Sequence, residues 1–457
     1  MHDVVIIGGG PGGYAAALYA HNFGLSVALV ERDKIGGTCL HRGCIPAKAL
    51  LQTAEVYTGV AGAAEFGVLT SEPVLDWNRA LERKNAIVDQ LHSGLIGLMK
   101  QRKIEIVEGT GSVAGPGMVD VTVSDGSHRR LEAPAVIVAT GSVPGSIPGY
   151  EVDGVHIVTS DHALEWERVP GRVAVIGAGA IGVEFASMLT DLGSEVHLFE
   201  VMDQVVPGVE PRAARLLERA LAQRGVDVHT GTGVDAPDVG PSGVTVPFGD
   251  SSVEVEVVLV AVGRSAVTAG IGLESTAAEL DQGYVVVDPQ TMETAQPGLY
   301  AVGDIVADAP QLAHAGFAEG IAAITHIATG VAAPVEYRAI PLVVYTHPEV
   351  ASVGLTEEQA RQAGYDVDTH DHGFGGVGRA IIKGQAQGMV KIVTQTDGPI
   401  LGATVVGPAA GELIHELMFS VAWEALPSEA AAFIHAHPTL AEAVGETLLA
   451  ASGKALH

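Results

Sequence analysis

Cysteine is scarce in this sequence, with only Cys39 and Cys44 among 457 residues. Two thiols cannot build the disulfide framework of a small secreted protein, so that class is excluded. A close pair flanked by glycines is instead more typical of a redox-active site than of two buried, inert residues.

Basic residues are also few. Lys and Arg total 25 against 54 Asp and Glu, which gives a formal net charge of −29. Such a surface repels nucleic acids and anionic membranes, so no partner of either kind is predicted. It would favour a basic protein partner, although solubility alone is sufficient to explain the charge.

No apolar run approaches the length of a membrane-spanning helix. The first run, Val4 to Ile7, leads directly into Gly8-Gly9-Gly10, which indicates the first strand of the fold and not a secretory signal. A soluble, cytoplasmic protein is therefore expected.

The chain is too long for one ordinary domain, so two to four are expected. Nearly half of the residues are apolar, at 47%, which is ample for sizeable cores. The 58 glycines follow no collagen-like period and cluster where strands turn into helices. Nucleotide-binding folds require glycines at such junctions.

An internal duplication organises the first half of the sequence. Residues 4–31 are VVIIGGGPGGYAAALYAHNFGLSVALVE, and residues 173–200 are VAVIGAGAIGVEFASMLTDLGSEVHLFE. Each copy predicts a buried strand, a GxGxxG turn, a helix and a second strand that ends in Glu. The aligned positions, 169 residues apart (173 minus 4), are Gly8 with Gly177, Gly10 with Gly179, Gly13 with Gly182, and Glu31 with Glu200.

Each copy has the features that a dinucleotide needs. The first Gly permits a tight turn, the second lets the backbone approach a pyrophosphate, and the third lets the helix pack closely on the strand. The helix N-terminus attracts the phosphates, and the Glu accepts hydrogen bonds from a ribose diol. One such turn is weak evidence, but two at one offset predict two dinucleotide sites more strongly than two purely structural units.

Glu200 bears on the choice of cofactor at the second site. Its carboxylate would repel a 2′-phosphate, and no Arg occurs in the Val201-Met202-Asp203 that follows. The second site is therefore predicted to prefer NAD to NADP.

The two cysteines lie in GGTCLHRGCIPAKAL, residues 36–50. We expect a glycine-flanked loop that leads into a helix beginning near Pro46. Cys44 would lie at or near the helix N-terminus, where a thiolate is stabilised, and Lys48 would share its face one turn later.

A possible acid–base pair lies near the C-terminus, in HAHPTLAEA at residues 435–443. Pro438 suits the first position of a helix, which would place Glu442 in its early part. A carboxylate bound to one nitrogen of His437 would fix the tautomer and leave the other nitrogen free to exchange a proton with a thiol. His435 is the alternative histidine.

Six motifs occur in an order similar to that of the pyridine nucleotide–disulfide oxidoreductase family. They are GGGPGG, GGTCLHRGCIPAK, VIVATGSVP, GAGAIGVEFA, YAVGDI and HAHPTLAEA, and the resemblance covers essentially the whole chain. It implies an α/β fold of two Rossmann-like dinucleotide-binding domains, for FAD and NAD, with a C-terminal α+β dimerisation domain. It also implies a homodimer with shared active sites.

The resemblance implies a division of the chain into four segments. Residues 1–145 and 266–338 would form the FAD-binding domain, since YAVGDI must return to the flavin. Residues 146–265 would form an inserted NAD-binding domain. Residues 339–457 would form the dimerisation domain.

The resemblance also implies roles for individual residues. Cys39 matches the thiol that exchanges with substrate, and Cys44 the thiol beside the flavin. Lys48 matches a lysine near the flavin that is ion-paired with Glu184. His437 matches the family's base because it directly precedes Pro, with Glu442 as its partner.

The same resemblance implies the cofactor contacts, and no metal site is predicted. Asp304 matches the carboxylate that binds the FAD ribityl chain; the alternatives are that it only caps the following helix or that it does both. The expected FAD contacts are Gly8, Gly10, Gly13, Glu31, Thr38, Lys48, Gly111, Thr140, Gly141, Asp304 and Ala313. The expected NAD contacts are Gly177, Gly179, Gly182, Glu200, Val234 and Gly263.

The stretch IHAHPTLAEAV most resembles a branch of this family that acts on dihydrolipoyl groups. This implies oxidation of dihydrolipoyl groups with reduction of NAD, and partners that are lipoyl-bearing acyltransferases or glycine-cleavage components. One alternative is an NAD(P)H-dependent reductase of a small disulfide such as mycothione. Another is a subunit or adaptor of an acyltransferase assembly, which is compatible with the first reading.

Overall fold

The computed structural model describes residues 2–457. Contacts within the chain divide it into two units. Of the described residues, the first comprises 2–49, Arg79–Pro144 and Arg264–Tyr337, and the second comprises Leu50–Asn78, Gly145–Gly263 and Arg338–His457.

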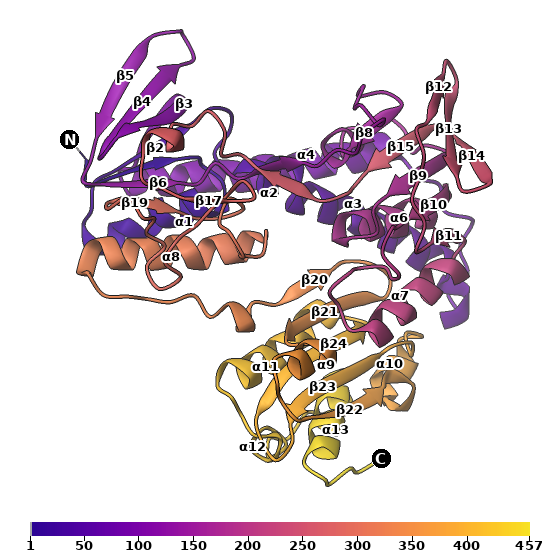
Figure 1. The fold of residues 1–457 in the computed structure, drawn as a ribbon. Coiled ribbons are helices and arrows are strands. Elements are labelled where there is room, and N and C mark those ends of the chain that lie inside the picture. Colours follow the sequence, from indigo (N-terminus) through magenta and orange to yellow (C-terminus); the bar gives the residue numbers. More distant parts are fainter. Residues whose placement is uncertain (1) are drawn as a thin grey trace. The chain divides into compact units, whose positions relative to one another are not determined.

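A seven-stranded sheet forms the centre of the first unit, with the strand order β19-β6-β1-β2-β3-β4-β5 (Figure 1). The first five strands of that order are parallel, and β4 and β5 continue antiparallel. The strands are β1 (Val4–Ile7), β2 (Val27–Glu31), β3 (Glu105–Gly115), β4 (Met118–Val123), β5 (His128–Glu132), β6 (Ala135–Val138) and β19 (Leu299–Ala301). All four residues of β1 are buried, as a continuous apolar run in a covered parallel sheet predicts.

Two helices of small residues lie side by side in this unit, α1 (Pro11–Ala20) and α8 (Ala313–Thr329). A Cβ on Gly320 would lie 2.6 Å from the Gly12 carbonyl oxygen, so glycine is needed for this approach. The unit also contains α2 (Gly37–Arg42), the first part of α3 (Cys44–Ala61) and most of α4 (Trp77–Gln101). Two antiparallel strand pairs complete it: β7 (Ser142–Pro144) with β16 (Arg264–Ala266), and β17 (Leu280–Asp281) with β18 (Tyr284–Val285).

The second unit contains a five-stranded parallel sheet in the order β11-β10-β9-β15-β8. A three-stranded antiparallel sheet packs on one of its faces through a shared core that includes Phe199, Val246 and Val258. The elements are β8 (Ile157–Thr159), α5 (Ser160–Ala163), β9 (Arg172–Ile176), α6 (Ala180–Asp191), β10 (Glu195–Phe199), α7 (Pro211–Gln223), β11 (Val226–His229), β12 (Asp238–Gly240), β13 (Gly243–Phe248), β14 (Ser251–Val255) and β15 (Val257–Val260).

The C-terminal part of the second unit is an antiparallel sheet in the order β20-β21-β24-β23-β22. Helices α11 and α13 bury Ile414, Leu417, Val444 and Leu448 in one core with this sheet. The elements are β20 (Leu342–Val344), β21 (Glu349–Gly354), α9 (Glu357–Gln362), β22 (Val367–Gly373), α10 (Gly378–Ile382), β23 (Met389–Gln395), β24 (Ile400–Gly407), α11 (Ala410–Ala422), α12 (Pro427–Ala430) and α13 (Glu442–Ala451).

The predicted fold class is confirmed, and two local predictions are wrong. The cysteines do not lie in a loop: Cys39 is inside α2, and Cys44 is the first residue of α3. Pro438 does not begin a helix, because α13 begins at Glu442.

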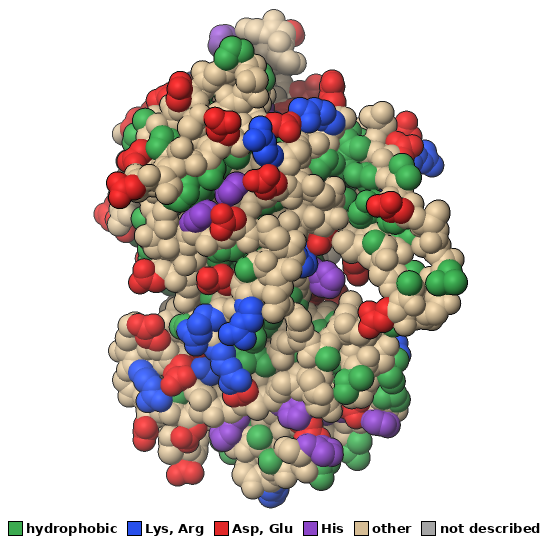
Figure 2. All heavy atoms as spheres, turned by 90° about the vertical axis from the view of Figure 1, so that its right-hand side faces the viewer, with side chains coloured by type: hydrophobic (Ala, Val, Ile, Leu, Met, Phe, Trp, Pro, Cys, Tyr) green, Lys and Arg blue, Asp and Glu red, His purple; other side chains and the backbone are tan. Residues whose placement is uncertain are grey.

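Within residues 2–457, no helix combines the length and the apolar character that crossing a membrane requires. On the face drawn in Figure 2, acidic side chains are scattered widely, whereas Lys and Arg gather in small groups. This agrees with the excess of acidic residues in the sequence.

Candidate active site

The first glycine turn connects β1 to α1 and leaves no room for side chains. Gly8 has φ +106°, and a Cβ there would lie 2.2 Å from the Ala139 carbonyl oxygen. A Cβ on Gly13 would lie 1.9 Å from the Gly8 carbonyl oxygen. Gly10 is the N-cap of α1, and no side chain caps this helix end. The turn therefore offers open backbone N–H groups to a pyrophosphate, which fits a dinucleotide.

The second glycine turn repeats this geometry between β9 and α6. Gly177 has φ +99°, and a Cβ on Gly182 would lie 1.8 Å from the Gly177 carbonyl oxygen. Gly179 is the N-cap of α6, again without a side-chain cap. The duplication seen in the sequence is thus also a duplication of turn geometry.

The two acidic residues at the strand ends also match. Glu31 accepts hydrogen bonds from the N–H groups of Gly9 (2.6 Å) and Asp33 (2.8 Å). Glu200 accepts hydrogen bonds from the N–H groups of Ala178 (2.8 Å) and Met202 (2.9 Å). Each carboxylate is held at the mouth of its glycine turn, where a ribose diol would lie.

The return segment brings Asp304 to the first turn's sheet. The Ser142 hydroxyl donates to the Asp304 carboxylate, and the Arg264 Nε donates to the Ser142 hydroxyl at 2.7 Å. Asp304 lies well before α8, so the alternative of a helix cap is wrong. Ala313 is the first residue of α8.

Close packing of glycines joins the return segment to the first turn. Gly316 of α8 lies against Gly12 and Gly303. A Cβ added to Gly316 would lie only 3.3 Å from the Gly12 nitrogen. A Cβ on Gly37 would lie 2.6 Å from the Gly10 Cα. Helices α1, α2 and α8 therefore all approach the same glycine turn.

The two thiols lie in hydrogen-bond contact with one another. The hydrogen bond with Cys44, followed by burial, raises the pKa of the Cys39 thiol above its ordinary value, and the charge of Lys48 opposes this effect. Lys48 is one turn beyond Cys44 in α3, as predicted. Burial, and then the two nearby thiols, raise the pKa of Tyr14 to about 12. Tyr14 was not singled out from the sequence, where only its position after GGGPGG marked it.

His437 and Glu442 form a hydrogen-bonded pair in the second unit. The His437 Nδ1 lies 2.7 Å from the Glu442 Oε1, and the Thr439 N–H donates to the Glu442 Oε2 at 2.9 Å. These two hydrogen bonds, with that of His437 the stronger cause, lower the pKa of Glu442. The His437 ring is 79% exposed, so its Nε2 is accessible to a substrate.

His435, the alternative histidine, has a different environment. Its Nε2 lies 2.7 Å from the Glu416 Oε1, and its ring packs against Gly445. The ring is only 13% exposed. His435 therefore holds α11 and α13 together and is not available as a base.

The other predicted residues fall into two groups. Gly111 lies in β3, where a Cβ would press on Ile7 and Val30, so packing is enough to account for its small size. Thr140 donates to the Val267 carbonyl at 2.6 Å, and Gly141 has φ +71°. Those placed in the first unit are Thr38, Lys48, Gly111, Thr140 and Gly141, and those in the second are Glu184, Val234 and Gly263.

Lys48 and Glu184 lie in different units, so their ion pair stays a prediction. Glu184 is a buried residue of α6, and its Oε1 accepts a hydrogen bond from the Tyr345 N–H at 3.0 Å. A buried carboxylate with a fixed orientation can act as a positioning residue.

No pattern in the sequence pointed to Glu319, a fully buried residue of α8. Its carboxylate accepts hydrogen bonds from the Gly303 N–H and the Tyr337 hydroxyl. Burial raises the pKa of Glu319 to about 7 in spite of these two bonds. Glu319 thereby fixes Gly303, the residue that precedes Asp304.

Comparison with known proteins gives consistent matches. Residues 2–320 match the family described as pyridine nucleotide-disulphide oxidoreductase, and residues 340–448 match the dimerisation domain of that family. The chain is 40% identical to a dihydrolipoyl dehydrogenase of Bacillus subtilis (strain 168), over 100% of this chain and 99% of that protein. It is 39% identical to mitochondrial dihydrolipoyl dehydrogenase 1 of Arabidopsis thaliana, over 100% of this chain and 91% of that protein.

A solved structure is similar over nearly the same extent. LpdA from Mycobacterium tuberculosis superposes with a TM-score of 0.90 at 28% identity, covering 97% of this chain and 98% of that chain. The likeness thus extends over nearly the whole of both chains.

Proposed function

The chain belongs to the pyridine nucleotide-disulphide oxidoreductase family, and from this premise we propose that it oxidises protein-bound dihydrolipoyl groups and reduces NAD⁺ to NADH. The observation that carries the proposal is the contact between Cys39 and Cys44 at the start of α3, in a chain about 40% identical to dihydrolipoyl dehydrogenase along its whole length. The family uses FAD and NAD, and the two open glycine turns fit two dinucleotides.

We assign residues 1–145 and 266–338 to the FAD-binding domain, 146–265 to the NAD-binding domain and 339–457 to the dimerisation domain. The sheets support this division of the chain, because all strands of each of the three large sheets come from only one of the three proposed domains. We likewise assign Gly8, Gly10, Gly13, Glu31, Thr38, Lys48, Gly111, Thr140, Gly141, Asp304 and Ala313 to FAD, and Gly177, Gly179, Gly182, Glu200, Val234 and Gly263 to NAD.

The chemistry begins with a proton transfer to His437. Its Nε2 takes the proton of a dihydrolipoyl thiol, while Glu442 holds Nδ1 as a donor and balances the imidazolium charge. The substrate thiolate attacks the Cys39 sulfur of the Cys39–Cys44 disulfide, and the bond to Cys44 breaks. The second substrate thiol then attacks the first substrate sulfur and gives its proton to the departing Cys39 sulfur, which forms the lipoyl disulfide and releases Cys39 as a thiol.

The products of exchange are a protonated Cys39 and a Cys44 thiolate. The raised pKa of Cys39 agrees with this division, because Cys39 would hold the returned proton. Cys44 is placed at a helix N-terminus, which stabilises a thiolate. FAD, when bound, would accept this electron pair as the Cys39–Cys44 disulfide re-forms with loss of the Cys39 proton, and it would supply the hydride that reduces NAD⁺.

The dimerisation-domain match supports a homodimer, and exposed apolar side chains support it further. Phe419 (50% exposed), Trp423 (76%), Phe433 (76%) and Ile434 (98%) lie in this part of the chain. A second copy that covered them would also approach His437, which follows Ile434 closely in the chain. We infer shared active sites from this proximity.

Lipoyl-bearing acyltransferases or glycine-cleavage components are the proposed partners, since they carry the substrate group. We place the enzyme in the cytoplasm, because two cysteines that cycle between thiol and disulfide suit a reducing compartment. A mycothione reductase is not favoured, because the full-length relatives described above are dihydrolipoyl dehydrogenases.

One assay tests the proposed function directly. The purified holoenzyme is given dihydrolipoamide and NAD⁺, and NADH formation is followed. In parallel it is given NADPH with mycothione or glutathione disulfide. The proposal requires the first activity to dominate. Rapid NADPH-dependent reduction of a small disulfide, with little activity on dihydrolipoamide, would reject it.

Cofactor preference gives a separate prediction. We expect kcat/KM for NAD⁺ to exceed that for NADP⁺ by at least about 100-fold, because a 2′-phosphate would meet the Glu200 carboxylate. Glu200→Gln keeps a similar shape and should narrow this ratio by about 10-fold.

Glu31→Gln is the matched control, because Glu31 makes the same two hydrogen bonds in the first copy of the repeat. It should loosen FAD but leave the NAD⁺/NADP⁺ ratio unchanged. Similar kcat/KM values for the two nucleotides in the unmodified enzyme would contradict the prediction.

A further inference from the structure

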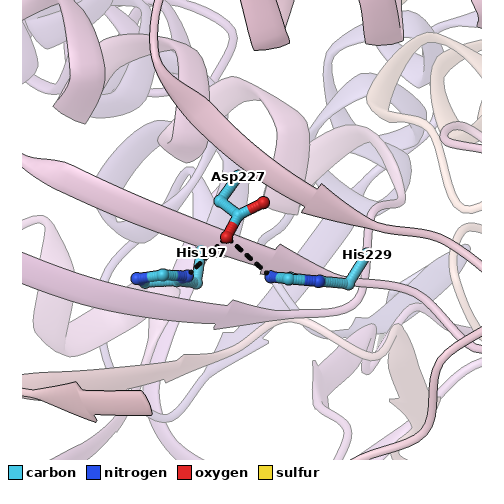
Figure 3. Close-up of side chains that lie close together, drawn as sticks. All are labelled: His197, Asp227 and His229. Carbon is cyan, nitrogen blue, oxygen red and sulfur yellow. Dashed lines mark ion pairs between the residues drawn. The ribbon is translucent and has the colours of Figure 1, made fainter. Parts of the chain in front are cut away.

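Three side chains that the proposed chemistry does not use converge at the edge of a sheet in the second unit (Figure 3). His197 lies on β10, and Asp227 and His229 lie on the edge strand β11. The parallel register places His197 directly beside Asp227. Since alternate residues of a strand share a face, His229 lies on that same face.

The spacing of their polar atoms suits a metal ion. The Asp227 Oδ2 lies 3.3 Å from the His197 Nδ1 and 3.2 Å from the His229 Nε2. All three atoms lie within 4.8 Å of one another. Tetrahedral zinc with bonds of about 2.0–2.1 Å separates neighbouring ligand atoms by about 3.3 Å. The separations of 3.3 and 3.2 Å between the Asp227 oxygen and the two histidine nitrogens therefore match two ligand–ligand distances of such a site.

The two histidine nitrogens are buried and make no hydrogen bond. Buried polar atoms normally have hydrogen-bond partners, so two orphans that face one carboxylate oxygen need an explanation. Their contacts of 3.3 and 3.2 Å with the Asp227 Oδ2 do not have the geometry of hydrogen bonds. A cation between the three atoms satisfies all of them with neutral rings.

Neighbouring side chains orient the rings. The Glu195 Oε1 lies 3.3 Å from the His197 Nε2, so this nitrogen can carry the proton while Nδ1 presents its lone pair to the site. A carboxylate behind a histidine ligand is the usual support of a metal site. Phe199 stacks on the His229 ring, with centroids 4.6 Å apart and planes at 12°.

We propose that His197, Asp227 and His229 bind one divalent transition-metal ion of the zinc class. Two imidazole nitrogens and one carboxylate oxygen are ligands that Zn²⁺ accepts. Asp227 is exposed, so an ion has an entry path and water can complete the tetrahedron. The ion clamps β11 to β10 beside Glu200, whose N–H donates to the His229 carbonyl at 3.0 Å.

The site was missed in the sequence because it depends on the register between two strands. Asp227 and His229 have the alternation of a strand, but nothing in the sequence pairs them with His197. The proposal is independent of the dehydrogenase reaction, since it concerns a surface that the proposed chemistry does not use.

Zn²⁺ titration by isothermal calorimetry tests the proposal. The holoenzyme is used free of any affinity tag, pretreated with EDTA and fully oxidised, so that Cys39 and Cys44 are not available as thiolate ligands. We expect one site per chain that is lost in His197→Gln and in His229→Gln. Glu195→Gln should weaken binding by about 10- to 100-fold.

His2→Gln is the matched control, because the His2 Nε2 pairs with the Glu105 Oε2 at 3.0 Å without a second histidine. It should bind Zn²⁺ like the unmodified enzyme. FAD content and the melting temperature in EDTA check that each variant folds. Asp227→Asn is a further variant that changes the third ligand, at an exposed position. Cu²⁺ electron paramagnetic resonance should show two nitrogen ligands only when both histidines are present. Equal Zn²⁺ binding by the unmodified enzyme and the His197 and His229 variants, or no binding by any of them, would overturn the proposal.

Discussion

The Cys44→Ser enzyme is expected to keep its FAD but to lose its long-wavelength thiolate–flavin absorbance, together with nearly all oxidation of dihydrolipoamide. Cys44 begins α3 and contacts Cys39, so it is the thiol placed to hold a negative charge. Serine cannot form a disulfide, and its hydroxyl is not ionised at neutral pH. Because the two thiols act as a unit, we expect turnover to fall by more than about 1,000-fold.

Two controls separate loss of the thiol from loss of the fold. Cys39→Ser should also stop turnover, but it should keep the thiolate absorbance, because Cys44 remains. Both variants should still pass electrons from NADH to an artificial dye, since that route needs no thiol. Near-normal dihydrolipoamide turnover in Cys44→Ser would refute the disulfide mechanism while leaving the fold assignment intact.

The parts of this site that the sequence predicts are those that one local segment determines. The strand, glycine turn and helix at residues 4–20 follow from the burial of Val4–Ile7 and from the steric needs of Gly8 and Gly13. A Cβ on Gly13 would collide with the carbonyl oxygen of Gly8, and Gly8 itself has φ +106°, so the turn is encoded within a few residues. The second copy could be predicted for the same reason.

The parts that the sequence did not predict depend on contacts between distant segments. Ser142 and Arg264 meet at Asp304 because β7 pairs with β16, a pairing between strands that are far apart in the chain. Glu319 of α8 supports Gly303, which follows β19, and this contact joins segments that are separate in the chain. A local pattern can also give a wrong prediction. Pro438 is compatible with the start of a helix, but α13 begins only at Glu442.

Replacing His437 by Gln is expected to lower dihydrolipoamide turnover by about 100- to 10,000-fold, the usual contribution of a positioned base. Glu442→Gln should cost less, because Glu442 orients and charges the base but transfers no proton itself. The His437 hydrogen bond lowers the pKa of Glu442, so its carboxylate stays ionised to a lower pH than that of an ordinary Glu. His435→Gln is the matched control and should retain turnover per folded enzyme, since His435 is bound to Glu416.

Subunit complementation tests whether His437 serves the cysteines of the partner subunit. Inactive Cys44→Ser and His437→Gln dimers are mixed, dissociated and reassociated, and native mass spectrometry establishes that heterodimers have formed. If sites are shared, each heterodimer has one intact site, with Cys44 from one chain and His437 from the other, and activity returns. If each site is built within one chain, every site keeps a lesion. Background activity from proven heterodimers would therefore reject shared sites, and because each parent variant is inactive for its own reason, the disulfide chemistry would stand unchanged.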